Sequence, residues 1–224
     1  MNRTELRTWL QQEAEPRYAA FASSLLPDNT HPLLGVRLPK LRRSARRLAA
    51  EHGLAFLRTL PPKGCSFEEL MLCGMLIGYV KEATWEQRTA ALDRLVPRLD
   101  NWSLCDSCCA TYSFVRAERE RTWAWLQPYL FSTGEYTRRF GVVMLLNHFL
   151  QEPAWAARCA AVLPQVQGGA YYADMAVAWC ACELALRHPA LAPALLAEGT
   201  LPEPTRRLAF RKLRESRRHP SPKK

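Results

Sequence analysis

Apolar residues recur at helical spacing along almost the whole chain. Leu, Ala and Met stand three and four residues apart with arginine and glutamate between them, and runs that alternate Val, Ile or Thr with polar residues are absent. The first pattern is typical of amphipathic helices and the second of strands, so the sequence predicts an all-α fold. Proline and glycine separate the amphipathic stretches and divide the chain into roughly a dozen short helices.

Capping residues mark several helix starts. Ser66 and Glu69 form the capping-box pattern, which predicts a helix beginning there. Thr84 begins the next helix, and Asp100 or Asn101 caps the one after it. Each of these residue types accepts a hydrogen bond from an N–H group in the first turn of the helix that follows, so the predicted boundaries have a physical cause.

The helix starts repeat at a regular interval. Starts near Ser66, Asp100, Glu135 and Tyr171 lie 34 to 36 residues apart, and each first helix is followed by a second. Tandem pairs at this period are typical of HEAT-like solenoids, in which antiparallel helix pairs stack on one another. The repeats follow each other without a linker-like segment, so we expect a single domain over residues 1–218 and a disordered basic tail over residues 219–224.

The net charge of the chain indicates which class of partner it binds. The chain has 31 Lys and Arg residues against 21 Asp and Glu residues, which gives a net charge of +10. This surplus favours a polyanionic partner, nucleic acid before membrane. Two segments concentrate it, namely the end of the chain from residue 206 and the cluster Arg42, Arg43, Arg46 and Arg47. The alternative is a soluble protein that is basic without such a partner.

Whether the cysteines are free thiols or form disulfides depends on the cellular compartment of the protein. The first residues are charged where a signal peptide needs an apolar run, and no stretch approaches the roughly 18 apolar residues of a membrane span, so we expect a cytoplasmic protein with free thiols. Cys105, Cys108 and Cys109 share one helix and Cys180 and Cys182 another, a number of thiolates that is in principle enough for zinc. Because no Cys-x-x-Cys pair flanks a turn, we expect buried thiols and no metal. An organic cofactor is not expected either.

Asp106 is the first candidate for chemistry. It is the only charged residue between Ser103 and Phe114, and Trp102 lies one helical turn before it on the same face. An unpaired buried carboxylate is costly, so Asp106 is expected either at a functional site or as a capping or ion-paired residue.

Two further groups stand on later helices. Arg138 and Arg139 precede a strongly apolar stretch, where either can pair with Asp106 or clamp a phosphate, and a solvated arginine pair is the alternative. Trp179 shares a helical stripe with Met175 and with two other residues, Cys182 and Leu186. A stripe of this kind is more often core than functional surface.

Several blocks, taken together and in order, resemble the DNA alkylation repair family. They are residues 34–43 and 67–71, Asp100-Asn101-Trp102 with Cys105-Asp106, Arg139-Phe140 with residues 142–146, Tyr171-Tyr172 with residues 175–179, and residues 211–216. The resemblance implies a right-handed solenoid of HEAT-like repeats that excises N3- and N7-alkylated purines from duplex DNA. It also implies that Asp106 is catalytic, and that Trp102, Trp179 and Arg139 contact the DNA, with Arg138 as the alternative to Arg139.

Three residues between Trp102 and Asp106 differ from those of the best-understood glycosylases. They are Ser103, Leu104 and Cys105. Some branches of the family bind DNA without excising bases. Three functions therefore stay open: an alkylpurine DNA glycosylase acting as a monomer, a DNA-damage or DNA-structure binding protein without excision activity, and a HEAT-like scaffold for an acidic protein. Arg42, Arg43, Arg46 and Arg47 favour nucleic acid over the scaffold.

Overall fold

The structure, a computed structural model, describes residues 3–58, 61–166 and 168–217. These residues form twelve α-helices and four short 3-10 helices and contain no strand, so the predicted all-α class is confirmed. The 3-10 helices are η1 (Val96–Arg98), η2 (Ser113–Glu118), η3 (Leu163–Gln165) and η4 (Pro189–Leu191). The tail predicted at residues 219–224 lies outside the described residues.

The chain divides into two compact units, an N-terminal unit of residues 1–114 and a C-terminal unit of residues 115–224. Each unit is described by itself. The single domain and the solenoid that the sequence predicts over residues 1–218 remain predictions.

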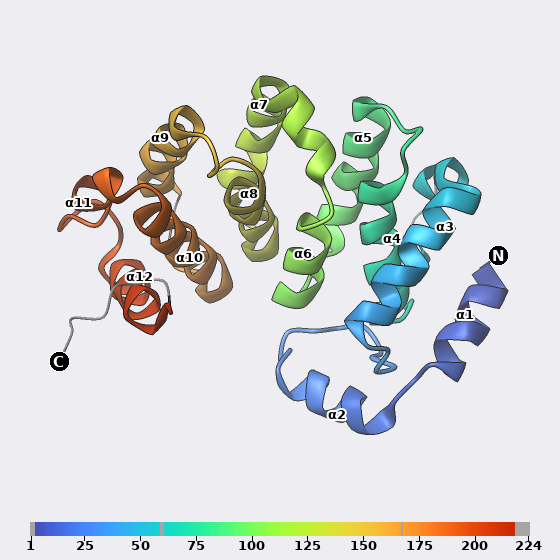
Figure 1. Cartoon of the computed structure of the whole chain (residues 1–224). Helices are drawn as coiled ribbons and strands as arrows, with labels where there is room; N and C mark the ends of the chain where they lie inside the picture. Colours follow the sequence, from blue (N-terminus) through green and yellow to red (C-terminus); the bar gives the residue numbers. More distant parts are fainter. Residues whose placement is uncertain (1–2, 59–60, 167, 218–224) are drawn as a thin grey trace. The chain divides into compact units, whose positions relative to one another are not determined.

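The N-terminal unit is built around one apolar helix, α4 (Phe67–Tyr79). It packs against α3 (Leu38–Arg58), α5 (Trp85–Leu95) and α6 (Trp102–Cys109), while α1 (Arg3–Gln12) and α2 (Pro16–Ser24) complete the unit (Figure 1). Leu70, Leu72, Met75 and Leu76 of α4 are fully or almost fully buried. Apolar residues on several sides of α4 therefore give it partners on several sides, and α6 is one of them.

Predicted caps begin three of these helices. The Ser66–Glu69 box is complete, since the Glu69 N–H donates to Ser66 Oγ and the Ser66 N–H donates to Glu69 Oε2, both at 3.1 Å. Thr84 forms a second capping box at the start of α5. Of the two N-caps predicted for α6, the structure has Asn101, whose Oδ1 accepts a hydrogen bond from the Leu104 N–H at 2.9 Å. Asp100 does not cap α6 because its carboxylate accepts bonds from Thr30.

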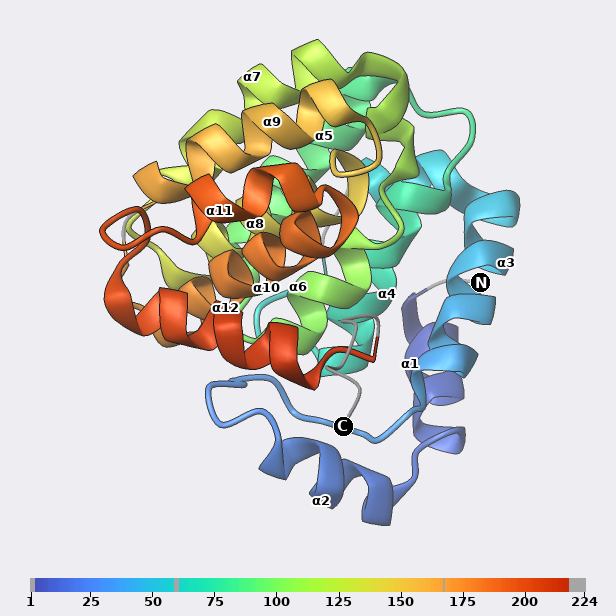
Figure 2. The same ribbon diagram turned by 60° about the vertical axis from the view of Figure 1, so that its left-hand side comes forward.

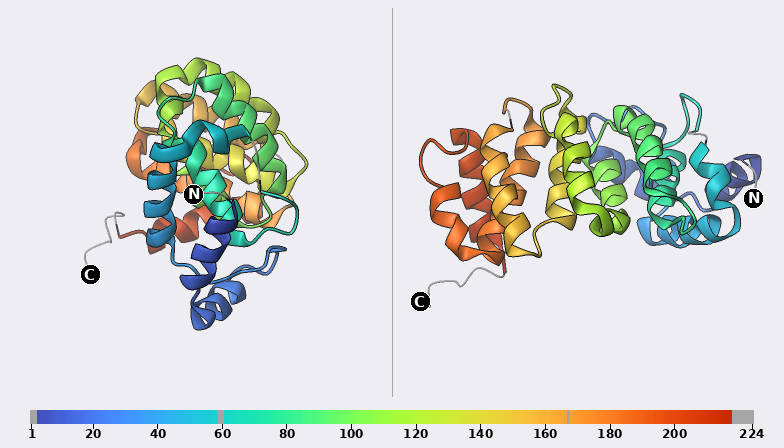
Figure 3. Two further views of the ribbon diagram at one scale, coloured as in Figure 1. Left: turned by 90° about the vertical axis from the view of Figure 1, so that its right-hand side faces the viewer. Right: turned by 90° about the horizontal axis from the view of Figure 1, so that it is seen from above.

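The C-terminal unit contains six α-helices, which follow one another along the chain as three pairs. Figures 2 and 3 draw them in colours from yellow-green to red. The pairs are α7 (Arg119–Leu130) with α8 (Glu135–His148), α9 (Pro153–Val162) with α10 (Tyr171–Arg187), and α11 (Ala192–Leu195) with α12 (Glu203–Glu215). Helix α10 packs between α8 and α12, which makes one row, and α7 covers α8 while α9 and α11 contact α10. Stacked pairs of this kind bury a continuous apolar layer within the unit.

The predicted repeat of helix starts agrees with the structure. Helices α4, α6, α8 and α10 begin at Phe67, Trp102, Glu135 and Tyr171, and one further helix follows each of them. Side-chain caps mark the starts of α4 and α6, whereas α8 and α10 begin after Gly134 and Ala170 without one.

Cysteine serves as a small packing residue where α4 meets α6. The Cys108 thiol lies 3.7 Å from the Met71 carbonyl oxygen, and a Cβ added to Gly74 would overlap the Cys108 sulfur. All eight cysteines are buried free thiols. Burial raises the pKa of Cys108 and Cys180 and raises that of Cys159 to about 12, so these thiols stay protonated at neutral pH.

Two features of the described residues concern membrane and metal binding. Their helices include none that is long and apolar enough to cross a membrane. Their His, Cys, Asp and Glu side chains nowhere gather in a group of three or more that could hold a metal ion.

Candidate nucleic-acid interface

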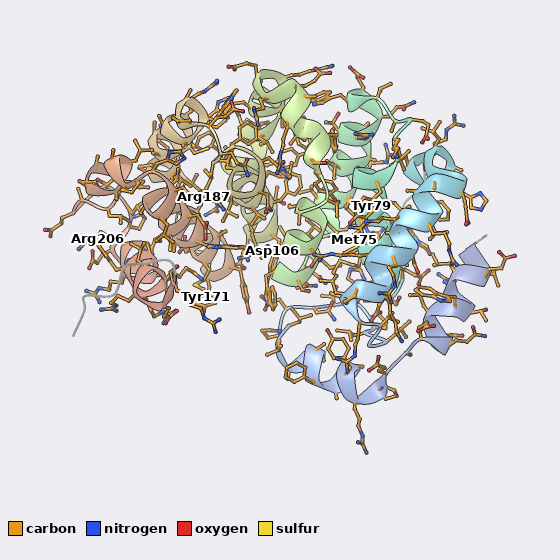
Figure 4. All side chains as sticks on the ribbon, viewed as in Figure 1. Met75, Tyr79, Asp106, Tyr171, Arg187 and Arg206 are labelled. Carbon is orange, nitrogen blue, oxygen red and sulfur yellow. The ribbon has the colours of Figure 1, made fainter. Side chains whose placement is uncertain are left out.

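Helix α6 is split lengthwise into a buried face and a half-exposed face. Its buried face consists of Leu104, Cys105, Cys108 and Cys109. Trp102, Ser103, Asp106 and Ser107 are half-buried and form the other face. Asp106 therefore lies at the surface of the N-terminal unit (Figure 4). Trp102 is one turn away on the same face, as the spacing of the two residues predicts.

The interpretation of Asp106 as a capping residue is wrong. Asp106 stands in the middle of α6, whose N-cap is Asn101. Its charge nevertheless affects the helix, because it adds to burial and to Cys105 in raising the pKa of Cys109. Asp106 is the only Asp, Glu, Lys or Arg residue of α6.

Long-range bonds hold the start of α6. The Trp102 indole Nε1 donates to the Leu25 carbonyl oxygen at 3.1 Å, directly after α2. Asn101 Nδ2 donates to Asn29 Oδ1 at 3.3 Å, and the Thr30 N–H donates to Asp100 Oδ2 at 2.7 Å. These bonds fix both the direction of α6 and the ring of Trp102, which is the support that a positioned carboxylate requires.

The four arginines of α3 form two pairs and not the single cluster that the sequence suggests. Arg42 is half-buried, and its charge acts on the buried Cys108 of α6. The Arg46 guanidinium carbon lies 5.1 Å from the ring centroid of Tyr79, the last residue of α4. Arg43 and Arg47 line a cavity beside α1. Successive residues of a helix point about 100° apart, which separates the two pairs.

Arg138 and Arg139 of α8 are not a solvated pair, because their exposed fractions are only 5% and 6%. Arg138 Nε donates to the Ser132 carbonyl oxygen at 2.9 Å, so this side chain turns back onto the loop before its own helix. Arg139 Nη1 donates to the Tyr172 carbonyl oxygen at 2.6 Å and so reaches the first turn of α10. The two neighbours therefore have different roles within the C-terminal unit.

Glu135 and three tyrosines surround this arginine contact, and their positions in the sequence predict no functional role for them. The Tyr172 N–H donates to Glu135 Oε1 at 2.5 Å. The rings of Tyr136 and Tyr172 stack with centroids 5.6 Å apart, and Tyr171 beside them is 61% exposed. Tyr171 and Tyr172 belong to a block that carries the family resemblance, which is the signal in the sequence that points to this group.

Trp179 lies on α10 and is half-buried, as are Met175 and Leu186, whereas Cys182 is buried. The core interpretation of this stripe therefore holds for Cys182 alone. Trp179 belongs to the same unit as Arg139, while Trp102 and Asp106 belong to the N-terminal unit. A pairing of Asp106 with either arginine remains a prediction.

Comparison with known protein families places almost the whole chain in one of them. Residues 3–213 match the model of the family described as DNA alkylation repair enzyme. Neither the curated proteins nor the solved structures contain a match to the chain. The match includes α1 and α2, which precede the blocks that carry the resemblance in the sequence, and it continues almost to the end of α12. Because it spans nearly the whole sequence, this chain belongs to the DNA alkylation repair enzyme family.

Proposed function

We propose that the protein is a DNA glycosylase that hydrolyses the N-glycosidic bond of N3- and N7-alkylated purines in duplex DNA, with Asp106 as its catalytic residue. The observation that carries the proposal is the position of the Asp106 carboxylate on the half-exposed face of α6, one turn from Trp102. Membership of a DNA alkylation repair family supports the substrate class. The protein would act as a monomer.

A single carboxylate is enough for this reaction. An alkylated purine already carries a positive charge, so it leaves without protonation by a general acid. The bond from C1′ of the deoxyribose to the purine nitrogen breaks, its electron pair neutralises the base, and positive charge builds on the sugar. Asp106 would stabilise that charge and orient the water whose oxygen bonds to C1′ while its proton is released.

The other predicted residues would position the DNA. Trp102 and Trp179 would pack against sugar and backbone, contacts that do not depend on sequence. Arg139 would neutralise a neighbouring phosphate, and its bond to the Tyr172 carbonyl oxygen would hold the guanidinium in place. Arg138, which donates to the Ser132 carbonyl oxygen, is the alternative in this role.

The test is release of 7-methylpurine from methylated duplex DNA by the wild type, Asp106→Asn and Asp93→Asn. Asparagine keeps the size of aspartate but lacks its charge, so excision by Asp106→Asn should fall by a factor of about 10² to 10³. DNA affinity and melting temperature should stay close to those of the wild type. Asp93 is an exposed carboxylate on α5 of the same unit, so Asp93→Asn should excise normally. Undiminished excision by Asp106→Asn would refute the assigned mechanism.

Damage binding without excision is the second candidate. The net charge of +10 and the exposed arginines of α3 support DNA binding, and they do not require catalysis. Binding by the wild type with no release of 7-methylpurine would favour this candidate over the glycosylase.

A further inference from the structure

A cavity of about 280 Å³ lies between α1 and α3 in the N-terminal unit. Figures 1 and 2 show α1 beside the first half of α3. The lining side chains come from these two helices and the turn after α1; they are Trp9, Glu13, Lys40, Arg43, Ser44 and Arg47. This cavity, called the α1–α3 pocket below, lies on a different side of α3 from Arg42 and Arg46.

Contacts away from the α1–α3 pocket hold α1 in place. Leu6 and Leu10 of α1 are buried. Arg7 Nε donates to Glu69 Oε1 at 2.9 Å, which ties α1 to α4. The pocket is therefore a preformed feature of the unit and does not depend on a ligand to bring its two helices together.

Charge in the pocket is unbalanced. Lys40 Nζ lies 2.6 Å from Glu13 Oε2, so the one carboxylate that lines the pocket already has its partner. Arg43 and Arg47 are exposed and have no ion-pair partner among the described residues. Residues four apart on a helix lie on one face, so the two unneutralised guanidinium groups converge on the same space. An anion is the ligand that this arrangement favours.

The uncharged lining narrows the kind of anion. The Ser44 hydroxyl is a hydrogen-bond donor, and the Trp9 indole gives an apolar surface of the size of a sugar ring. Side-chain amides, which recognise adenine by paired hydrogen bonds, are missing from the residues that line the pocket. Arginine and serine with an aromatic neighbour suit a phosphate and its deoxyribose, read without regard to the base.

We propose that the α1–α3 pocket binds a backbone phosphate of DNA, as a contact separate from the Asp106 face of α6. The proposal rests on the proposed function in that it takes duplex DNA as the ligand. It assigns Arg43 and Arg47 to this pocket and leaves Arg42 and Arg46 for the side of α3 that faces α4 and α6. This phosphate contact raises the affinity of the protein for duplex DNA without any gain in base selectivity.

The first experiment measures binding of undamaged duplex DNA over about 50 to 200 mM salt for the wild type, Arg43→Ala/Arg47→Ala and a control, because the salt dependence counts the phosphates contacted. The control is Arg58→Ala/Lys81→Ala, which removes two charges from exposed residues of the same unit outside the pocket. Loss of one phosphate contact should make the slope of log K against log salt shallower by about 0.9 for the pocket variant. The control should keep the wild-type slope.

A pocket variant that matches the control in affinity and slope would overturn the proposal, and normal 7-methylpurine release by the wild type would show that the proposed function survives. A wild type that neither binds duplex DNA nor excises bases would instead refute the proposed function. Titration with inorganic pyrophosphate separates the two sources of phosphate. Pyrophosphate binding that is lost in Arg43→Ala/Arg47→Ala, with duplex binding unchanged, would assign the pocket to a free phosphate and overturn the DNA contact.

Discussion

Replacement of Gly74 by alanine tests the close approach of α4 to α6, the helix that carries Asp106. A Cβ at Gly74 would overlap the Cys108 sulfur and would lie 3.2 Å from Leu95 Cδ2 and 3.3 Å from Cys108 Cβ. Cys108 is itself buried against Met71, so its thiol has little room to move. The new methyl group therefore requires a shift of α6 or a strained side chain.

Two opposing effects set the magnitude. Overpacking of a buried site costs about 1–3 kcal/mol. Alanine is the better helix former by about 1 kcal/mol, which offsets part of that cost. Gly74→Ala should therefore lower the free energy of unfolding by up to about 2 kcal/mol. Urea denaturation followed by circular dichroism measures this difference.

The matched control is the double variant Gly74→Ala/Cys108→Ala. Removal of the Cys108 sulfur empties the space that the methyl group at residue 74 needs. The double variant should therefore be more stable than Gly74→Ala alone, although Cys108→Ala by itself leaves a small cavity and destabilises the wild type. If Gly74→Ala equals or exceeds the wild type in stability, the helices are not as close as the structure places them.

Three further predictions concern a buried carboxylate, the buried thiols and Arg139. Burial raises the pKa of Glu68, so the folded protein holds that proton more tightly, and the free energy of unfolding should fall as pH rises above 4.5. Glu68→Gln should lack this part of the pH profile in urea melts between about pH 4 and 7, and identical profiles would contradict the assignment. The eight buried thiols, Cys159 with its pKa near 12 among them, should react with a disulfide reagent only after denaturation; rapid labelling of the native protein would count against their burial. Arg139→Ala should lower both duplex affinity and excision, with the melting temperature recorded because the bond to Tyr172 is also lost; unchanged affinity would remove Arg139 from the interface.

Glu68 also illustrates how a loop is held in the N-terminal unit. Its carboxylate is buried and accepts hydrogen bonds from the N–H groups of Leu34, Gly35 and Val36, at 2.8 to 3.3 Å. Gly35 has φ +89°, and a Cβ there would overlap the backbone of α2, so only glycine fits. These bonds lower the pKa of Glu68, but burial outweighs them.

Local chemistry determined most of the helices. The starts of α4 and α6 could be predicted because a cap involves residues within about four positions of one another. Helices α8 and α10 begin without a side-chain cap, and their prediction rests on the helical period of their apolar residues. The family could be recognised for a similar reason, since its blocks follow one another along the chain. Placement of Asp106 and Trp102 on one face needed only the period of the α-helix.

Long-range partners decided what the sequence left open. Asp100 and Asn101 are equally able to cap α6, and the choice follows from Thr30, about 70 residues away, which occupies the Asp100 carboxylate. The arginines of α3 are neighbours in sequence, yet α1 provides a pocket for Arg43 and Arg47, and the ring of Tyr79 takes Arg46. The bonds that a polar side chain forms depend on which element packs beside it, and that is a property of the tertiary structure alone.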